Sequence, residues 1–296
     1  MRALVTGGAG FVGTNLIKRL LKDGHKVVSI DNYSTGYKEN EQDGCKYFDI
    51  DLRNTTDFLL HMEKPTDFSF YMEKPDVIFH LAALARIQPS LRDPKPAIDT
   101  NFNGTLNVLE YARQNDVQVI YSGSSTKHHG VFKSPYAWSK FGGEQLCELY
   151  SKVYDLNTTI CRFYNAYGEH HIRTGAYATV VGIFEDQFLN NKPLTITADG
   201  EQRRDFTHVD DIVEALISCA GKDFRAEEFE LGRGINYSIN EIADMFGEDY
   251  PKEYIQKRPG EYPETLADSS NAKNILGWEP TKKIGDYITN WIKENK

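Results

Sequence analysis

The chain has 296 residues, of which 34 are basic and 43 acidic, for a net charge of −9. This length suits one large domain or two joined domains and excludes a small disulfide-stapled scaffold. The acidic balance leaves no overall positive field for phosphate groups, so we expect no nucleic-acid partner. Because no run of 18 apolar residues occurs and the first residues carry no leader pattern, we expect no membrane association and a cytoplasmic location.

Short apolar runs alternate with amphipathic stretches in the first half of the chain. The runs predict buried parallel strands at 3–6, 27–30, 77–80, 117–121 and 158–163. The stretches between them predict helices at 12–22, 101–114 and 136–154. This alternation predicts an α/β fold, a Rossmann-type doubly wound parallel sheet. Before the third run, Met-Glu-Lys-Pro at 62–65 recurs at 72–75, which we interpret as a duplication in a surface loop.

The pattern loosens after about residue 165. We expect a hairpin-like turn around Asp199 and Gly200, and a helix at 212–220 with Asp210 or Asp211 as its N-cap. A strand at 229–231 would return to the main sheet, and closing helices are predicted at 239–246, 271–276 and 284–292. The sequence therefore predicts a Rossmann domain at 1–165 with returns near 206–232, and a smaller, discontinuous C-terminal domain at 166–205 and 233–296.

The first predicted strand leads directly into a glycine-rich turn and then a helix. Gly7 permits the tight turn, Gly10 lets the backbone approach a pyrophosphate at the helix N-terminus, and Gly13 allows close packing of the helix. Asp31 ends the second strand, where a carboxylate accepts hydrogen bonds from both hydroxyls of an adenosine ribose and repels a 2′-phosphate. These residues predict a dinucleotide site that prefers NAD to NADP.

Tyr136 and Lys140 lie four residues apart at the start of a predicted helix, so the phenol and the ammonium share one face. A tyrosine that acts as a general base needs its pKa lowered from near 10 toward neutrality, and a neighbouring ammonium favours the phenolate. We expect Lys140 to supply this shift.

Nine short motifs occur in a fixed order over nearly the whole chain. They are the glycine turn, Asp31-Asn32, Asp51-Leu52-Arg53, His80-Leu81-Ala82-Ala83, Asn101-x-Asn103-Gly104-Thr105, Ser122-Gly123-Ser124-Ser125, Tyr136-x-x-x-Lys140, Arg203-Arg204-Asp205-Phe206 and Arg258-Pro259-Gly260-Glu261. Together they resemble the extended short-chain dehydrogenase/reductase family of nucleotide-sugar epimerases and dehydratases, and within it they are most similar to the UDP-glucose 4-epimerases. The match is specific to the superfamily and much less specific to the substrate.

The resemblance implies a role for each matching position. For NAD, from the pyrophosphate through the adenosine to the nicotinamide, the implied residues are Gly7, Gly10, Phe11, Val12, Gly13, Asp31, Asn32, Asp51, Leu52, Ala82, Ala83, Tyr136 and Lys140. For the nucleotide sugar they are Ser124, Tyr136, Asn165, Arg204 and Arg258. Tyr136 would be the base, Ser124 would share the hydrogen bond to the reacting sugar oxygen, and the two arginines would grip the pyrophosphate. Members of this family pair two helices of each chain, so the resemblance also implies a homodimer.

The function that the resemblance implies is NAD-dependent epimerisation, an inversion at C4 of a UDP-hexose through a transient 4-keto sugar. A dehydratase of this family would carry an Asp-Glu pair directly after the catalytic hydroxyl residue, and a decarboxylase a Glu at position 126, where this chain has Ser125 and Thr126. An epimerase/reductase of 4-keto-6-deoxy sugars stays an alternative, although it would need NADPH and Asp31 opposes it. A non-catalytic dinucleotide sensor is a second alternative, opposed by the presence of Tyr136 and Lys140.

Several features leave the substrate open. The loop after Ser124 reads Lys127-His128-His129-Gly130 where members of the family read Val-Tyr-Gly, and only five more residues precede Tyr136. Arg86 faces either the substrate or a surface ion pair. The base, the sugar and the carbon that is inverted are therefore not fixed by the sequence. The cysteines and the paired histidines lack metal-ligand spacing, so we expect no metal.

Overall fold

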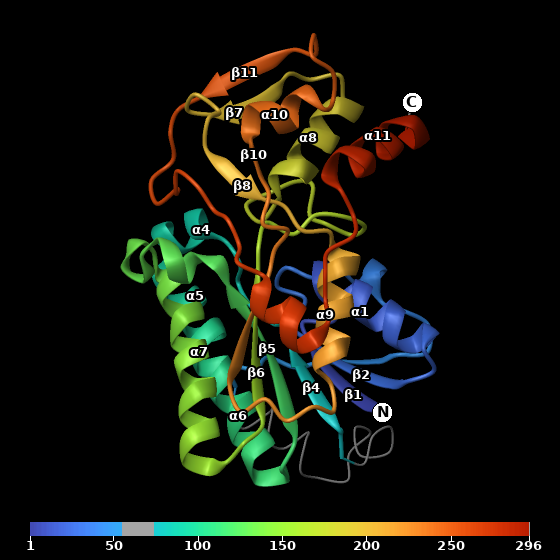
Figure 1. Cartoon of the computed structure of the whole chain (residues 1–296), viewed down its shortest axis with the longest axis vertical. Coiled ribbons are helices and arrows are strands. Elements are labelled where there is room, and N and C mark those ends of the chain that lie inside the picture. Colours follow the sequence, from blue (N-terminus) through green and yellow to red (C-terminus); the bar gives the residue numbers. More distant parts are fainter. Residues whose placement is uncertain (55–73, 296) are drawn as a thin grey trace.

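The computed structural model of the chain describes residues 1–54 and 74–295. Its centre is a seven-stranded sheet, parallel throughout, in the order β3-β2-β1-β4-β5-β6-β9 (Figure 1). The strands are β1 (Arg2–Thr6), β2 (Lys26–Asp31), β3 (Lys46–Asp49), β4 (Val77–His80), β5 (Gln118–Ser124), β6 (Thr158–Phe163) and β9 (Glu227–Leu231). The strand order reverses between β1 and β4, which is where doubly wound sheets bind their ligands.

The predicted Rossmann-type sheet is confirmed, with one strand that the sequence did not reveal. The edge strand β3 is only partly buried, so no continuous apolar run marks it, and Val77–His80 is the fourth strand of the chain rather than the third. The predicted duplication lies outside the described residues, apart from Lys74 and Pro75.

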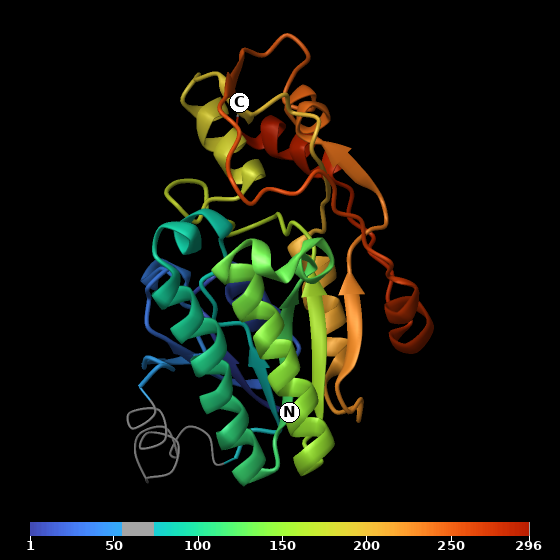
Figure 2. The same cartoon turned by 90° about the vertical axis from the view of Figure 1, so that its left-hand side faces the viewer.

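Helices cover both faces of the sheet (Figures 1 and 2). Leu4 of β1 packs in an apolar cluster with α6 (Gly104–Asn115) and α7 (Pro135–Tyr154), whereas its neighbour Ala3 packs with α1 (Phe11–Lys22) and α9 (Val209–Cys219). Ser134 caps α7 by accepting a hydrogen bond from the Ala137 N–H at 3.1 Å. Among the described helices, none is both long and apolar enough to cross a membrane.

Short helical segments link β4 to α6, and two more follow the carboxyl end of β5. They are α4 (Ile87–Arg92), α5 (Pro94–Ile98) and the π-helical turn η2 (Asp99–Asn103), followed after β5 by the 3₁₀ turns η3 (Ser125–His129) and η4 (Val131–Lys133). The predicted helix at 101–114 therefore begins with a π-helical turn and continues as α6.

The C-terminal part contributes two small sheets and a separate apolar cluster. Its elements are α8 (Val180–Leu189), β7 (Leu194–Thr197), β8 (Arg203–Asp205), β10 (Asn236–Ser238), α10 (Ile239–Asp244), β11 (Lys252–Ile255) and α11 (Ile284–Asn295). The predicted hairpin is wrong. A turn does occur at Gly200, but β7 pairs in parallel with β11 and β8 pairs antiparallel with β10, because later segments supply the partner strands.

The predicted N-cap of α9 is also wrong. The helix begins earlier, at Val209, and the His208 ring accepts the Asp210 N–H at 3.1 Å. Asp211 instead binds the backbone N–H groups of residues 281 and 282. This contact holds the chain after η5 (Ala272–Leu276) against α9, where Trp278 is buried in the cluster of the main sheet. The division of the chain into the two predicted domains stays a prediction.

Candidate active site

A cavity of about 860 Å³ lies at the carboxyl ends of the main strands, with part of its wall supplied by the C-terminal sheets. Every residue that the sequence predicts for the site lines it: Gly7, Gly10, Phe11, Val12, Gly13, Asp31, Asn32, Asp51, Leu52, Ala82, Ala83, Ser124, Tyr136, Lys140, Asn165, Arg204 and Arg258. The fold thus gathers residues from distant parts of the chain in one place. The role of each stays a prediction at this stage.

The glycine turn between β1 and α1 leaves no room for side chains. Gly7 has a φ of +74°, and a Cβ there would lie 2.8 Å from the Ala82 backbone. A Cβ on Gly13 would lie 2.2 Å from the Gly7 carbonyl oxygen. Gly10 is the N-cap residue of α1 and has no side chain that could accept hydrogen bonds from the N–H groups of the first helical turn. The turn therefore forms a cradle in which a phosphate can reach free backbone N–H groups.

The end of β2 presents a carboxylate that is already fixed in position. Asp31 accepts the Ala9 N–H at 2.9 Å through one oxygen and the Tyr33 N–H at 2.8 Å through the other. Each carboxylate oxygen keeps a further lone pair, so both can still accept a ribose hydroxyl. Burial raises the pKa of Asp31, while the two backbone hydrogen bonds favour its charged form. Next to it, Asn32 donates to Asp51, whose pKa is lowered to about 2, mainly by its hydrogen bond with Arg53.

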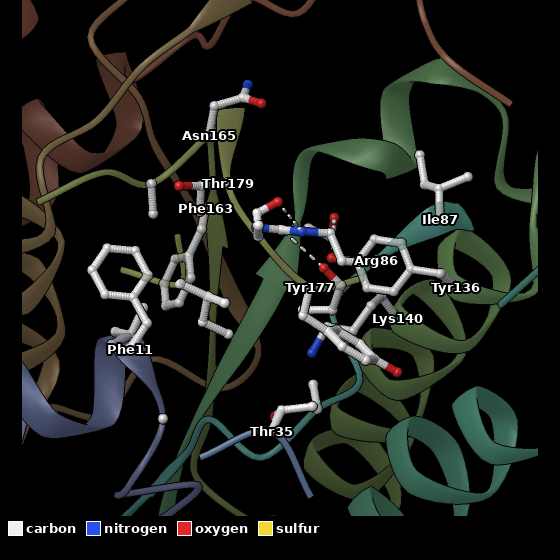
Figure 3. A pocket seen from close by; sticks show the side chains of 18 of the residues that line it. Phe11, Thr35, Arg86, Ile87, Tyr136, Lys140, Phe163, Asn165, Tyr177 and Thr179 are labelled. Atoms are coloured by element: carbon white, nitrogen blue, oxygen red, sulfur yellow. Dashed lines mark hydrogen bonds between the residues drawn. The ribbon is translucent and has the colours of Figure 1, made fainter. Parts of the chain in front are cut away.

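Three residues form the candidate catalytic group at the end of β5 and the start of α7 (Figure 3). The Tyr136 hydroxyl lies 3.3 Å from the Ser124 Oγ, so both can meet one sugar oxygen. One turn further along α7, Lys140 donates to the Ser122 Oγ at 3.3 Å, and its Nζ lies 4.3 Å from the centroid of the Tyr121 ring. The ring and the hydroxyl hold the ammonium in place behind the phenol.

Burial shifts the pKa of two residues in this group. Burial raises the pKa of Tyr136 above its ordinary value, and the Ser124 hydroxyl and the Arg86 guanidinium oppose that rise. Burial lowers the pKa of Lys140 to about 8. In the chain without NAD the pKa of Tyr136 is raised and Arg86 is a cation that opposes the rise, so the expected effect of Lys140 on this pKa stays a prediction.

A buried ion pair lies behind Ser124, and the sequence analysis missed it. Glu144 of α7 and Arg162 of β6 are almost inaccessible, with side chains 1% and 2% exposed, and they are joined at 2.9 Å. Glu144 also accepts the Ser124 N–H at 3.3 Å. Through this contact the ion pair fixes the backbone that presents the Ser124 hydroxyl.

The loop after Ser124, whose sequence differs from that of the family, is held by ion pairs to strand β9. Lys127 binds Glu228 at 2.9 Å, and His128 pairs with Glu230. The ring of His129 packs at a tilt against Tyr262, with centroids 4.9 Å apart. Among the described residues, the buried His129 Nε2 and Tyr262 Oη have no hydrogen-bond partner. In the described part of the chain, no group of three or more His, Cys, Asp or Glu side chains is placed to hold a metal ion.

The far side of the cavity carries the predicted substrate residues. The Asn165 amide donates to the Asp205 carbonyl at 3.1 Å and to the Thr265 hydroxyl at 3.2 Å. Burial lowers the pKa of Arg204, while Glu261 opposes that shift. Arg258 lines the same wall. Two guanidinium groups therefore face a shared space suited to an anion.

Arg86 lines the cavity rather than the outer surface (Figure 3). Its Nε donates to the Ala178 carbonyl at 3.3 Å, and no carboxylate of the described residues pairs with it. Tyr177 lies beside it, in a segment whose lack of hydrophobic periodicity gave the sequence analysis no signal. The surface ion pair considered for Arg86 is therefore wrong.

A sequence model described as the NAD dependent epimerase/dehydratase family matches residues 3–232, which is most of the chain. This chain belongs to the NAD-dependent epimerase/dehydratase family. A "UDP-glucuronate 4-epimerase" of Thermodesulfobacterium geofontis is 33% identical over 99% of this chain and 96% of its own length. A "UDP-glucose 4-epimerase" of Mycolicibacterium smegmatis is 32% identical over 99% of this chain and 98% of its own length.

Solved structures of the same family agree in fold. The UDP-glucose 4-epimerase of Thermus thermophilus in complex with NAD has a TM-score of 0.88, with 27% identity over 100% of this chain and 99% of that chain. NAD is the cofactor of this family member. Its residues fit that group, because Gly7 and Gly13 allow a tight turn in which a Cβ would clash with the backbone, and Asp31 is fixed where the ribose hydroxyls of NAD would reach it.

Proposed function

We propose that this family member is a 4-epimerase that inverts C4 of a UDP-hexose through a transient 4-keto sugar. The observation that carries this proposal is the pairing of Tyr136 with Ser124, 3.3 Å apart at the end of a cavity shaped for NAD. The hydroxyl of Thr126 follows and donates to Ser124 at 3.0 Å, at a position where the chain has no acidic residue. The site therefore has a base for oxidation at C4 and lacks the adjacent acid pair of the dehydratases.

The reaction transfers a hydride and a proton separately. Bound NAD supplies the acceptor and later the donor of the C4 hydride, so no net redox change results. Tyr136 accepts the proton of the C4 hydroxyl, and Ser124 donates a hydrogen bond to the same oxygen as the carbonyl forms. The 4-keto sugar rotates in the cavity. Once the hydride has returned to the opposite face of C4, Tyr136 gives the proton back to the C4 oxygen. Both groups thus act on one oxygen in both half-reactions.

The cations around Tyr136 make this proton transfer possible. In the free protein burial raises the pKa of the phenol, so the phenolate forms only if positive charge is close. Arg86 opposes the rise directly, and Lys140, next to Ser122, would meet the nicotinamide ribose. We infer that Lys140 serves both cofactor binding and proton transfer.

Arg204 and Arg258 anchor the substrate through its diphosphate. Planar guanidinium groups match phosphate oxygens in pairs, and the chain as a whole is acidic, so local arginines are needed to hold a dianion. Asn165 lies on the same wall and would contact the sugar-nucleotide near its phosphates. In this proposal the nucleotide lies on the C-terminal side and the sugar points toward Tyr136.

The two alternative functions would need a different cofactor or different residues. An epimerase/reductase of 4-keto-6-deoxy sugars would need NADPH, and the carboxylate of Asp31 repels a 2′-phosphate. A dinucleotide sensor would not need Tyr136 and Lys140, and both line the cavity. The test is to incubate the pure protein with UDP-glucose, UDP-glucuronate and their N-acetylated counterparts, and to identify products by NMR. C4 epimers support the proposal, whereas a reduced or dehydrated sugar would refute it.

We also propose a homodimer formed through α6 and α7. Leu149, Val153 and Tyr154 of α7 are 49%, 60% and 50% exposed, which is unusual for a cluster of large apolar side chains on one helix. Sedimentation velocity at micromolar concentration should show a dimer, and Leu149→Glu together with Val153→Glu should dissociate it. A wild-type monomer would contradict this proposal.

A further inference from the structure

Arg86 is held in a fixed position beside the candidate base. It precedes α4, and its guanidinium donates to the Ala178 carbonyl at 3.3 Å and to the Ala85 carbonyl at 3.0 Å. These contacts use two of the five N–H groups of an arginine, so the others are available to a ligand. Figure 3 shows Arg86, Tyr177, Tyr136 and Lys140 grouped together in the cavity.

The charge of this guanidinium has no counterpart in the described protein. The titratable groups that act on it are the phenols of Tyr136 and Tyr177, which are neutral at neutral pH, and no described carboxylate pairs with it. Arg86 is partly buried in the cavity wall, and this burial lowers its pKa. Keeping a partly buried cation without an anion is unfavourable, so such a group is expected where a ligand brings the anion.

The diphosphate of the substrate does not account for this cation. That anion is assigned to Arg204 and Arg258, which come from the C-terminal part of the chain, whereas Arg86 comes from the segment between β4 and α4. Arg86 instead acts on Tyr136, which meets the C4 oxygen in the proposed reaction. An anion that reaches Arg86 must therefore belong to the sugar.

We propose that Arg86 binds a carboxylate of the sugar, and that the substrate of this protein is a UDP-hexuronate rather than a UDP-hexose with a neutral CH₂OH group. In a hexuronate the carboxylate is attached to C5, the ring carbon next to C4. When the C4 oxygen meets Tyr136, the carboxylate therefore lies near a group that neighbours the same phenol. The inference rests on the proposed function and names the sugar that this site takes.

The test compares two substrates that differ only at C6. For the wild-type protein, kcat/KM should favour UDP-glucuronate over UDP-glucose by about 10- to 100-fold, the effect of one charge-assisted guanidinium–carboxylate pair. In Arg86→Met this preference should fall to near one, and in Arg86→Lys, which keeps the charge but loses the planar fork, it should be intermediate. Arg225→Met removes an exposed arginine at the opposite ends of the strands, and it should leave the preference unchanged.

Three results would overturn the inference. A wild-type protein that epimerises UDP-glucose well and UDP-glucuronate poorly would refute it and leave the proposed function intact. A loss in Arg86→Met that is equal for both substrates, with a shifted pH optimum, would show that Arg86 acts only on Tyr136. If neither sugar is epimerised, the proposed function fails, and calorimetric titration of the NAD-loaded protein still decides the inference. Equal affinities for the two UDP-sugars would then refute it, and a tighter UDP-glucuronate complex that Arg86→Met weakens would support it.

Discussion

Replacing Tyr136 with Phe removes one oxygen and keeps the ring. Within residues 1–54 and 74–295, the one hydrogen bond of that oxygen is the 3.3 Å contact with Ser124, so the free energy of unfolding should change by at most about 1 kcal/mol. That change corresponds to a melting shift of about 2–4 °C for a chain of this size. The variant should therefore fold and bind NAD as the wild type does.

The effect on turnover should be much larger. Loss of the base should lower kcat by about 10² to 10⁴, equivalent to about 3–5 kcal/mol of transition-state stabilisation. The wild-type rate should rise with pH as Tyr136 ionises to the phenolate, and the rise should level off once Lys140 loses its proton near its pKa of about 8. The rising limb belongs to Tyr136, so it should be absent from the residual activity of the Phe variant.

The assay is initial-rate epimerisation across pH 5 to 10, with NAD affinity and melting temperature measured on the same preparations. Tyr254→Phe in β11 is the matched control, because its ring is half exposed, it also loses one hydroxyl hydrogen bond, and it does not line the cavity. Near-normal turnover by Tyr136→Phe, with folding and NAD binding intact, would remove Tyr136 from the mechanism.

Three further predictions follow from the site. Asp31→Ala should narrow the difference between NAD and NADP affinity in titrations, because it removes the carboxylate that repels the 2′-phosphate; equal affinities in the wild type would contradict the assignment. Arg204→Ala and Arg258→Ala should each weaken UDP-sugar binding at least about tenfold in calorimetry, and a sugar 1-phosphate bound as tightly as the nucleotide sugar would place the anchor elsewhere. Glu144→Gln removes one of the carboxylates that pair with Arg162 while Glu228 stays 2.6 Å from it, so chemical denaturation should show a loss of about 1–3 kcal/mol together with reduced kcat. Glu148→Gln, one turn away and exposed, should lose no more than about 0.5 kcal/mol, and equal losses would refute the buried pair.

The sequence predicted the parts of the fold that local pattern determines. Strands such as β1 and β4 are buried on both faces and read as continuous apolar runs, whereas the partly exposed edge strand β3 carries no such signal. The pairing of β7 with β11 joins segments more than 50 residues apart, so the turn at Gly200 could be predicted but its partner strands could not.

Part of the candidate site could also be predicted from the sequence, and part could not. The glycine turn and Asp31 lie at strand ends, and the topology of a parallel sheet brings such ends together, which is why their gathering was predictable. Glu144 and Glu148 are both glutamates of α7, and nothing in the local sequence distinguishes them. The packing of α7 against β6 buries Glu144 beside Arg162 and leaves Glu148 exposed. The direction of the pKa shift at Tyr136 depends on burial and on Arg86, 50 residues earlier, and the spacing of Tyr136 and Lys140 carries no signal of either.

The most direct test of the account follows a label at the reacting carbon. UDP-glucose and UDP-glucuronate carrying deuterium at C4 are incubated with the NAD-loaded protein, and the sugars are examined by NMR while absorbance reports reduced cofactor. We expect the deuterium to stay at C4 in both epimers of the accepted sugar, with no net accumulation of NADH. Stoichiometric reduction of NAD, or exchange of the C4 label with solvent, would contradict the proposal that this protein is a 4-epimerase.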